Sequence, residues 1–111
     1  MPKQQSNKDP FTWDSVRRLV SPFPHVEEGT SYGTLAFRVK GKLAVRQRQD
    51  GKSVVLRSDF SWRESLMERD PVTFFITDHY RNHPWVLINM DTISELEFAS
   101  LFEAVWKEII G

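Results

Sequence analysis

The segment from Thr34 to Arg57 constrains the fold most, because it contains three short strand-like runs joined by two tight turns. Side chains of a strand point alternately to its two faces. In the first run Leu35, Phe37 and Val39 alternate with Ala36, Arg38 and Lys40, and in the second Leu43 and Val45 alternate with Ala44, Arg46 and Arg48. The sequence therefore predicts an antiparallel sheet with one apolar face and one basic face.

The two turns of this segment support the same interpretation. Gly41 separates the first run from the second, and Asp50-Gly51 separates the second from the third. Asp-Gly between alternating runs is a strong signal for a tight β-hairpin. In the third run apolar residues occupy both parities, so the face on which Arg57 lies is left open.

The remaining sequence predicts a mixed domain. We expect residues 1–11 to be a flexible tail and residues 12–111 to be a single domain. Helices are expected from 13 to 21 after Thr12, from a cap at Ser61 to Asp70-Pro71, and from Ser94 to the end, with strands at 73–77 and 85–89. Residues 25–33 fit either a short strand or an irregular approach to the sheet. The expected fold is α+β in the order α-β-β-β-α-β-β-α, with about five antiparallel strands and the helices packed on one face.

Composition excludes several classes of protein. The 111 residues include no cysteine, which rules out disulfides, thiolate metal sites and a cysteine nucleophile. No apolar run has the length of a signal peptide or of a membrane span. We therefore expect a cytoplasmic monomer that does not associate with membranes.

Charge is distributed unevenly along the chain. Lys and Arg balance Asp and Glu at 15 each, yet residues 34–57 carry seven basic residues against the single acid Asp50. The basic residues of this segment are Arg38, Lys40, Lys42, Arg46, Arg48, Lys52 and Arg57. A neutral chain is not expected to coat nucleic acid non-specifically, but a local excess of cations can steer an anionic partner to one side of the molecule.

Two longer stretches are similar to a known family. Residues 31–48, SYGTLAFRVKGKLAVRQR, and residues 69–90, RDPVTFFITDHYRNHPWVLINM, resemble the MmcQ/YjbR family of small bacterial proteins. The resemblance rests on Tyr32-Gly33, Phe37, Gly41-Lys42, Asp70-Pro71, His79-Tyr80 and Pro84-Trp85-Val86, and it extends from Thr12 to Ile110. It implies a frataxin-like or double-wing α+β fold and a DNA-binding role, and it brings no catalytic residues.

The first candidate site is the basic face of the sheet, here called the basic ribbon. Its nucleic-acid-binding residues would be Arg38, Lys40, Arg46, Arg48, Lys52 and Arg57, assisted by Arg81. The alternative is an ordinary solvated sheet face, whose cations pair with acids such as Glu64, Glu68 or those of the last helix.

The second candidate site is the loop at residues 78–85. It places His79, Tyr80, Arg81, His83 and Trp85 in one short span, where a small ligand or a protein partner would find arginine hydrogen bonds and aromatic surface. The structural alternative is that Trp85 begins a core strand, Pro84 fixes the turn and Tyr80 closes the edge of the core.

Metal binding and catalysis have weaker support. His79 and His83 are four residues apart, a spacing that suits a metal on a helix, but Pro84 argues against a helix there. The sequence contains no GxSxG elbow and no HExxH motif. We therefore expect a non-enzymatic DNA-binding protein with no metal and no cofactor, and the alternative is a ligand- or partner-binding module that uses the 78–85 loop.

Overall fold

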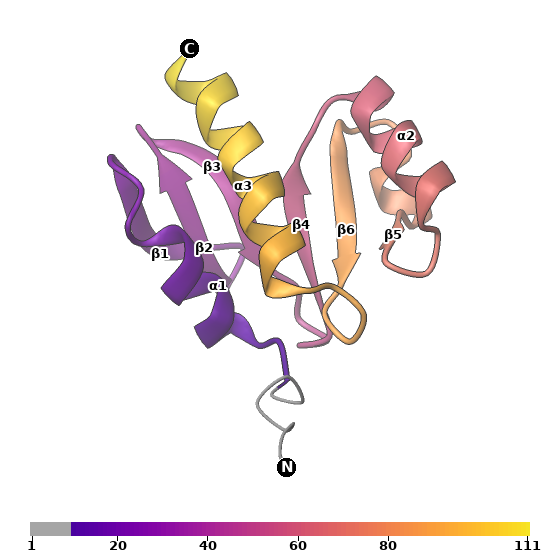
Figure 1. Cartoon of the computed structure of the whole chain (residues 1–111), viewed down its shortest axis with the longest axis horizontal. Helices are drawn as coiled ribbons and strands as arrows, with labels where there is room; N and C mark the ends of the chain where they lie inside the picture. Colours follow the sequence, from indigo (N-terminus) through magenta and orange to yellow (C-terminus); the bar gives the residue numbers. More distant parts are fainter. Residues whose placement is uncertain (1–9) are drawn as a thin grey trace.

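A computed structural model describes residues 10–111 of the chain, and it confirms the α+β class (Figure 1). The helices are α1 (Trp13–Val20), α2 (Phe60–Arg69), the short 3-10 helix η2 (Asp78–Tyr80) and α3 (Glu95–Ile110). The strands are β1 (Val26–Ser31), β2 (Thr34–Val39), β3 (Lys42–Gln47), β4 (Ser53–Arg57), β5 (Phe74–Phe75) and β6 (Trp85–Asn89). Of the expected tail at 1–11, only Pro10 and Phe11 belong to the described residues, and Phe11 packs against Phe98 with ring centroids 5.3 Å apart.

The strands form a single antiparallel sheet in the order β1-β2-β3-β4-β6-β5. The sheet has one strand more than expected, because residues 26–31 pair along their whole length with β2. The connecting turn is made by Tyr32 and Gly33, both with positive φ. At the other edge the strand expected at 73–77 is reduced to Phe74–Phe75.

Two of the three predicted helix caps are correct. α1 follows Thr12, and the Ser94 hydroxyl at the start of α3 accepts a hydrogen bond of 3.0 Å from the backbone N–H of Glu97. The predicted cap at Ser61 is wrong. The carboxylate of Asp59 accepts a 2.7 Å hydrogen bond from the backbone N–H of Trp62, so the helix begins two residues earlier.

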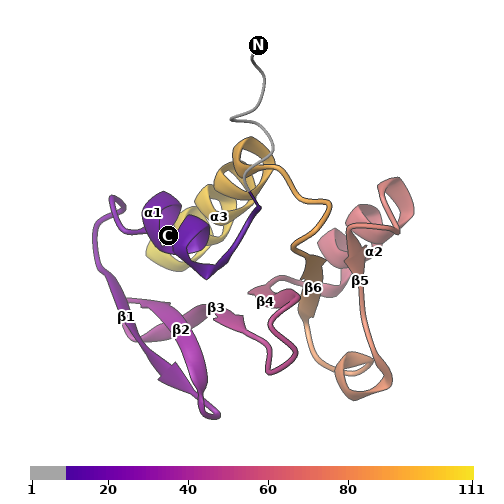
Figure 2. The same ribbon diagram turned by 90° about the horizontal axis from the view of Figure 1, so that it is seen from below.

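The two faces of the sheet are covered by different elements. α1 and α3 cover one face, whereas the β1–β2 hairpin and the segment between β5 and β6 extend to the opposite side (Figure 2). The main core lies under the helices and includes Phe37, Val39, Val45, Val54, Leu56, Phe74, Val86, Ile88, Phe98 and Phe102. On the opposite face, which no α-helix of residues 10–111 covers and which is here called the helix-free face, Val55, Leu87 and Tyr80 of η2 form a second, smaller cluster. β4 is therefore apolar on both faces.

A β-bulge corrects the predicted faces of β3. Phe37 pairs with Val45, but the next residue, Arg38, pairs with Leu43 rather than with Ala44. Ala44 is the extra residue of the bulge, and its side chain joins the main core. Leu43, expected in the apolar core, instead lies opposite Arg38 on the helix-free face.

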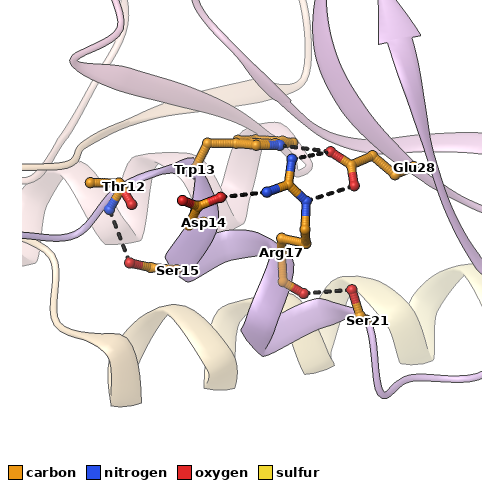
Figure 3. A network of polar contacts seen from close by, with 7 residues as sticks. All are labelled: Thr12, Trp13, Asp14, Ser15, Arg17, Ser21 and Glu28. Atoms are coloured by element: carbon orange, nitrogen blue, oxygen red, sulfur yellow. Dashed lines mark hydrogen bonds and ion pairs between the residues drawn. The ribbon is translucent and has the colours of Figure 1, made fainter.

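A polar network joins α1 to the edge strand β1 (Figure 3). The Glu28 carboxylate accepts hydrogen bonds from Arg17 Nε at 2.8 Å, from Arg17 Nη2 at 2.7 Å and from Trp13 Nε1 at 3.1 Å. Arg17 also pairs with Asp14. Hydrogen bonding to Arg17 is the largest cause that lowers the pKa of the Glu28 carboxyl, and it prevails over desolvation.

This network predicts a pH-dependent stability. A folded-state pKa below the unfolded value of about 4.3 means that ionised Glu28 stabilises the fold above that pH and ceases to do so as pH falls through the folded pKa. Glu28→Gln should therefore be less stable than the wild type near neutral pH, with a difference that shrinks below pH ~4. Urea unfolding at a series of pH values measures this.

The neighbouring Glu27→Gln is the matched control. Glu27 pairs with Arg38 in the strand register, and its side chain forms no hydrogen bond or ion pair among residues 10–111. The Glu27→Gln variant should be as stable as the wild type at every pH. A Glu28→Gln deficit that stays constant from neutral to acidic pH would contradict the assignment.

Candidate functional site

Arg46 connects the two candidate sites that the sequence suggested. It pairs with Ala36 on one side and with Val55 on the other, so it points to the helix-free face beside the smaller apolar cluster. The hydroxyl group of Tyr80, from η2, accepts a hydrogen bond from Arg46 Nη2. The basic ribbon and the 78–85 loop therefore form one surface rather than two alternative ones.

The two parts enclose an open hollow of about 310 Å³, here called the Tyr32 hollow. It lies between the β1–β2 turn, the end of β3, the β3–β4 turn and the η2 segment. Its lining consists of Tyr32, Arg46, Arg48, Gln49, Asp50, Thr77, His79 and Tyr80. Tyr32 is 83% exposed, and the guanidinium of Arg46 lies over its ring, 5.5 Å from the centroid.

Arg63 of α2 holds the 78–85 loop in place. Its side chain is 4% exposed, and Nη1 donates to the carbonyl oxygens of Tyr80 at 2.9 Å and His83 at 2.6 Å. Nη1 also lies 3.3 Å from the carbonyl oxygen of Trp85, and Nη2 donates to that of Arg81 at 3.2 Å. One side chain thus binds four carbonyl groups of the loop, which has little regular structure of its own.

Sequence reasoning missed Arg63. Its only carboxylate partner among the described residues is Glu64, at 3.6 Å, and Glu64 is largely exposed. A signal was present, because Arg63 precedes Leu66 and Met67 by three and four residues and so falls on the apolar side of α2. A cation at such a position predicts a buried polar partner.

Four arginines of the basic ribbon share the helix-free face, namely Arg38, Arg46, Arg48 and Arg57. Arg57, whose face the sequence left open, alternates with the core residue Leu56 and donates from Nε to the carbonyl oxygen of Leu43 at 2.7 Å. Arg38 donates to the carbonyl oxygen of Thr30 at 3.1 Å. All four are half-buried, and their guanidinium groups are oriented by the protein.

The cations do not form one compact cluster. Arg46, Arg48 and Lys52 lie at the end of the sheet that carries the Tyr32-Gly33 and Asp50-Gly51 turns. Lys40 and Arg57 lie at the opposite end, where Arg57 stacks over Trp85 at 5.2 Å. The helix-free face therefore has a basic group at each end, with the apolar cluster between them.

The loop residues divide into exposed and structural ones. Tyr80 is buried and Trp85 begins β6, as the structural alternative predicted. His79, Arg81 and His83 are exposed, and Arg81 pairs with Asp78 at 2.6 Å. His79 packs edge-on against Tyr80 with ring centroids 4.8 Å apart, so of the exposed loop residues it is the one that lines the Tyr32 hollow.

The ribbon cations are not paired with the acids that the solvated-face alternative named. Within residues 10–111, no carboxylate lies within 4.0 Å of the guanidinium of Arg38, Arg46 or Arg57. The helix acids pair elsewhere: Glu64 with Arg63, Glu95 with Arg18, Glu97 with Arg69, and Glu103 with Lys107. Three of the four arginines therefore keep their charge available to an anionic partner.

Asp50 is the acidic residue among those that line the Tyr32 hollow, and groups of its own turn offset much of its negative charge. Desolvation works to raise the pKa of its carboxyl, but the backbone N–H of Lys52 and the charge of Arg48 outweigh it, and the pKa lies below the ordinary value. Asp50 Oδ1 accepts from the Lys52 N–H at 2.9 Å, and Oδ2 lies 3.4 Å from Arg48 Nη1. The negative charge of Asp50 is therefore compensated by the Lys52 N–H and by Arg48.

The described part of the chain offers no cluster of three or more His, Asp or Glu side chains that would hold a metal ion. Its helices are all too short or too polar to cross a bilayer.

Fold and site together define a small α+β domain whose polar site lies on the helix-free face of an antiparallel sheet. The YjbR family model matches residues 21–108, and the chain belongs to the YjbR family, as the sequence motifs indicated. The crystal structure of Deinococcus radiodurans protein DR2400, a DUF419 domain, superposes with a TM-score of 0.73 at 22% identity, covering 89% of this chain and 79% of that one. No curated protein matches the sequence.

The role of Arg63 can be tested by Arg63→Lys, which keeps the charge but loses the planar fork of donors. Several buried carbonyl groups would lose their partner, so we expect the free energy of unfolding to fall by roughly 2–4 kcal/mol. Amide hydrogen exchange in residues 78–85 should accelerate more than in β2 and β3, and exchange measured by NMR checks this.

Arg69→Lys is the matched control on the same helix. Arg69 is exposed and makes one ion pair, with Glu97, so its replacement should change stability by no more than about 0.5 kcal/mol. Equal effects of the two substitutions would show that Arg63 does not organise the loop.

Proposed function

We propose that this protein is a non-enzymatic nucleic-acid-binding domain that contacts phosphates through the helix-free face of its sheet. The observation that carries the proposal is the set of half-buried arginines on that face, three of which have no carboxylate partner among the described residues. Affinity for nucleic acid derives largely from arginine and lysine contacts to phosphate. The DNA-binding role implied by the family resemblance agrees with this in kind.

The orientation of the guanidinium groups supports the same function. Arg38 and Arg57 each use one donor on a backbone carbonyl oxygen, and a guanidinium has five N–H donors. The remaining donors stay available for bidentate bonds to phosphate. Because these side chains are already positioned, less conformational entropy is lost on binding than with free surface lysines.

Both ends of the face can take part in binding. Arg46, Arg48 and the Lys52 turn form one group, Lys40 and Arg57 form the other, and Arg81 lies beside the face in the 78–85 loop. A strand of nucleic acid that crosses the face would meet both groups. The alternative function, binding of a small ligand or protein partner at the 78–85 loop, would use the Tyr32 hollow alone.

The test is a fluorescence-anisotropy titration against a random duplex and a random single strand at ~0.05 M and ~0.15 M salt. Arg46→Glu/Arg48→Glu should lower affinity on the order of tenfold or more and reduce the log-log salt slope by about two. Arg48→Glu alone, which leaves the Arg46–Tyr80 hydrogen bond intact, should produce part of the effect.

The control is Arg18→Glu/Lys107→Glu, which changes the net charge equally but on the helical side of the molecule, where both cations are exposed. Its affinity should remain close to that of the wild type. If ribbon and control variants lose affinity equally, binding follows net charge and the face is not the contact surface. A wild type that binds neither nucleic acid would favour the small-ligand alternative.

A further inference from the structure

Tyr32 has features that neither the core nor the phosphate contacts require. It is 83% exposed, about as much as Leu96 of α3 at 84%, and its φ is +54°. Tyr32 and Gly33 are the two central residues of the β1–β2 hairpin turn, and both have the positive φ that a two-residue hairpin turn requires. The turn places an aromatic ring at the rim of the Tyr32 hollow, where it makes little contact with the domain.

The ring is nevertheless held in a defined place. Arg46 lies over the ring of Tyr32, Arg46 donates a hydrogen bond to the Tyr80 hydroxyl, and the backbone of Tyr80 is held by Arg63. A chain of contacts thus runs from the buried Arg63 to the exposed Tyr32. With Arg46 on one side and most of the residue exposed, the rest of the ring is open to a planar group.

The size and chemistry of the hollow fit a single nucleotide. Its volume of about 310 Å³ is at the lower end of the range for small-molecule sites, roughly 300–1,000 Å³. Tyr32 offers a stacking surface, Arg46 and Arg48 offer donors to a phosphate, and Thr77 and His79 add polar groups at the opposite rim. Base pairs in a duplex are already stacked on their neighbours, so a tyrosine ring stacks on an unpaired base at a lower cost than on a paired one.

We propose that the Tyr32 hollow binds one unpaired nucleotide of a single strand, with the base stacked on Tyr32 and its phosphate at Arg46 and Arg48. This inference rests on the proposed nucleic-acid function and makes it more specific, since it gives the domain a preference for single-stranded over duplex nucleic acid. The phosphate contacts along the rest of the face are shared by both forms.

The first experiment needs no substitution. Wild-type protein is titrated with a random single strand, with an abasic strand of the same length and with a random duplex. The single strand should bind on the order of tenfold more tightly than the abasic strand, because stacking contributes roughly 1–3 kcal/mol per base. Equal affinity for normal and abasic strands, or tighter binding of duplex, would overturn the inference while leaving the proposed function intact.

The second experiment uses Tyr32→Ala and Tyr32→Phe. Tyr32→Ala should weaken single-strand binding on the order of tenfold and change duplex binding by no more than about twofold, whereas Tyr32→Phe, which keeps the ring, should retain the preference. Leu96→Ala, which truncates a residue that is 84% exposed on α3, is the control and should change neither affinity. Equal loss for both forms in Tyr32→Ala would overturn the inference. Failure of the wild type to bind any strand would overturn the proposed function together with it.

Discussion

A buried cation determines how the helix-free face is built. An arginine can be buried only if hydrogen bonds replace the water that it loses, and Arg63 finds its acceptors in four carbonyl groups of the 78–85 loop. The loop in turn has few regular backbone partners, so the same bonds satisfy its carbonyl groups. These shared hydrogen bonds join α2 to the loop and position the backbone of Tyr80.

The two faces of the sheet differ in composition and in the elements that cover them. The helices and the large apolar core occupy one face, so the other can expose arginines without loss of the main packing. The small cluster of Val55, Leu87 and Tyr80 supports the centre of that face. It places Val55 beside Arg46, and the buried ring of Tyr80 carries the hydroxyl that accepts the hydrogen bond from Arg46.

Local patterns in the sequence predicted much of the fold. The Asp50-Gly51 hairpin, the strand at 85–89 and the cap at Ser94 were correct, because turn chemistry and periodicity act between near neighbours. The bulge at Ala44 was not visible, since alternation alone does not show where a strand gains a residue. The link between ribbon and loop was also missed, because the contact of Arg46 with Tyr80 joins residues 34 positions apart.

The candidate site combines Arg46 of β3 with Tyr80, which is synthesised 34 residues later. Within residues 10–111 β5 pairs with β6 and with no other strand, and β6 lies between it and β4, so β5 joins the sheet after residues 85–89 have been made and paired. Non-local pairing of this kind forms late, because the loop must be closed before any contact offsets its entropy. A nascent chain that ends before β6 has the basic β2–β3 hairpin, but β5 and the candidate site next to it are joined to the sheet only when β6 has paired.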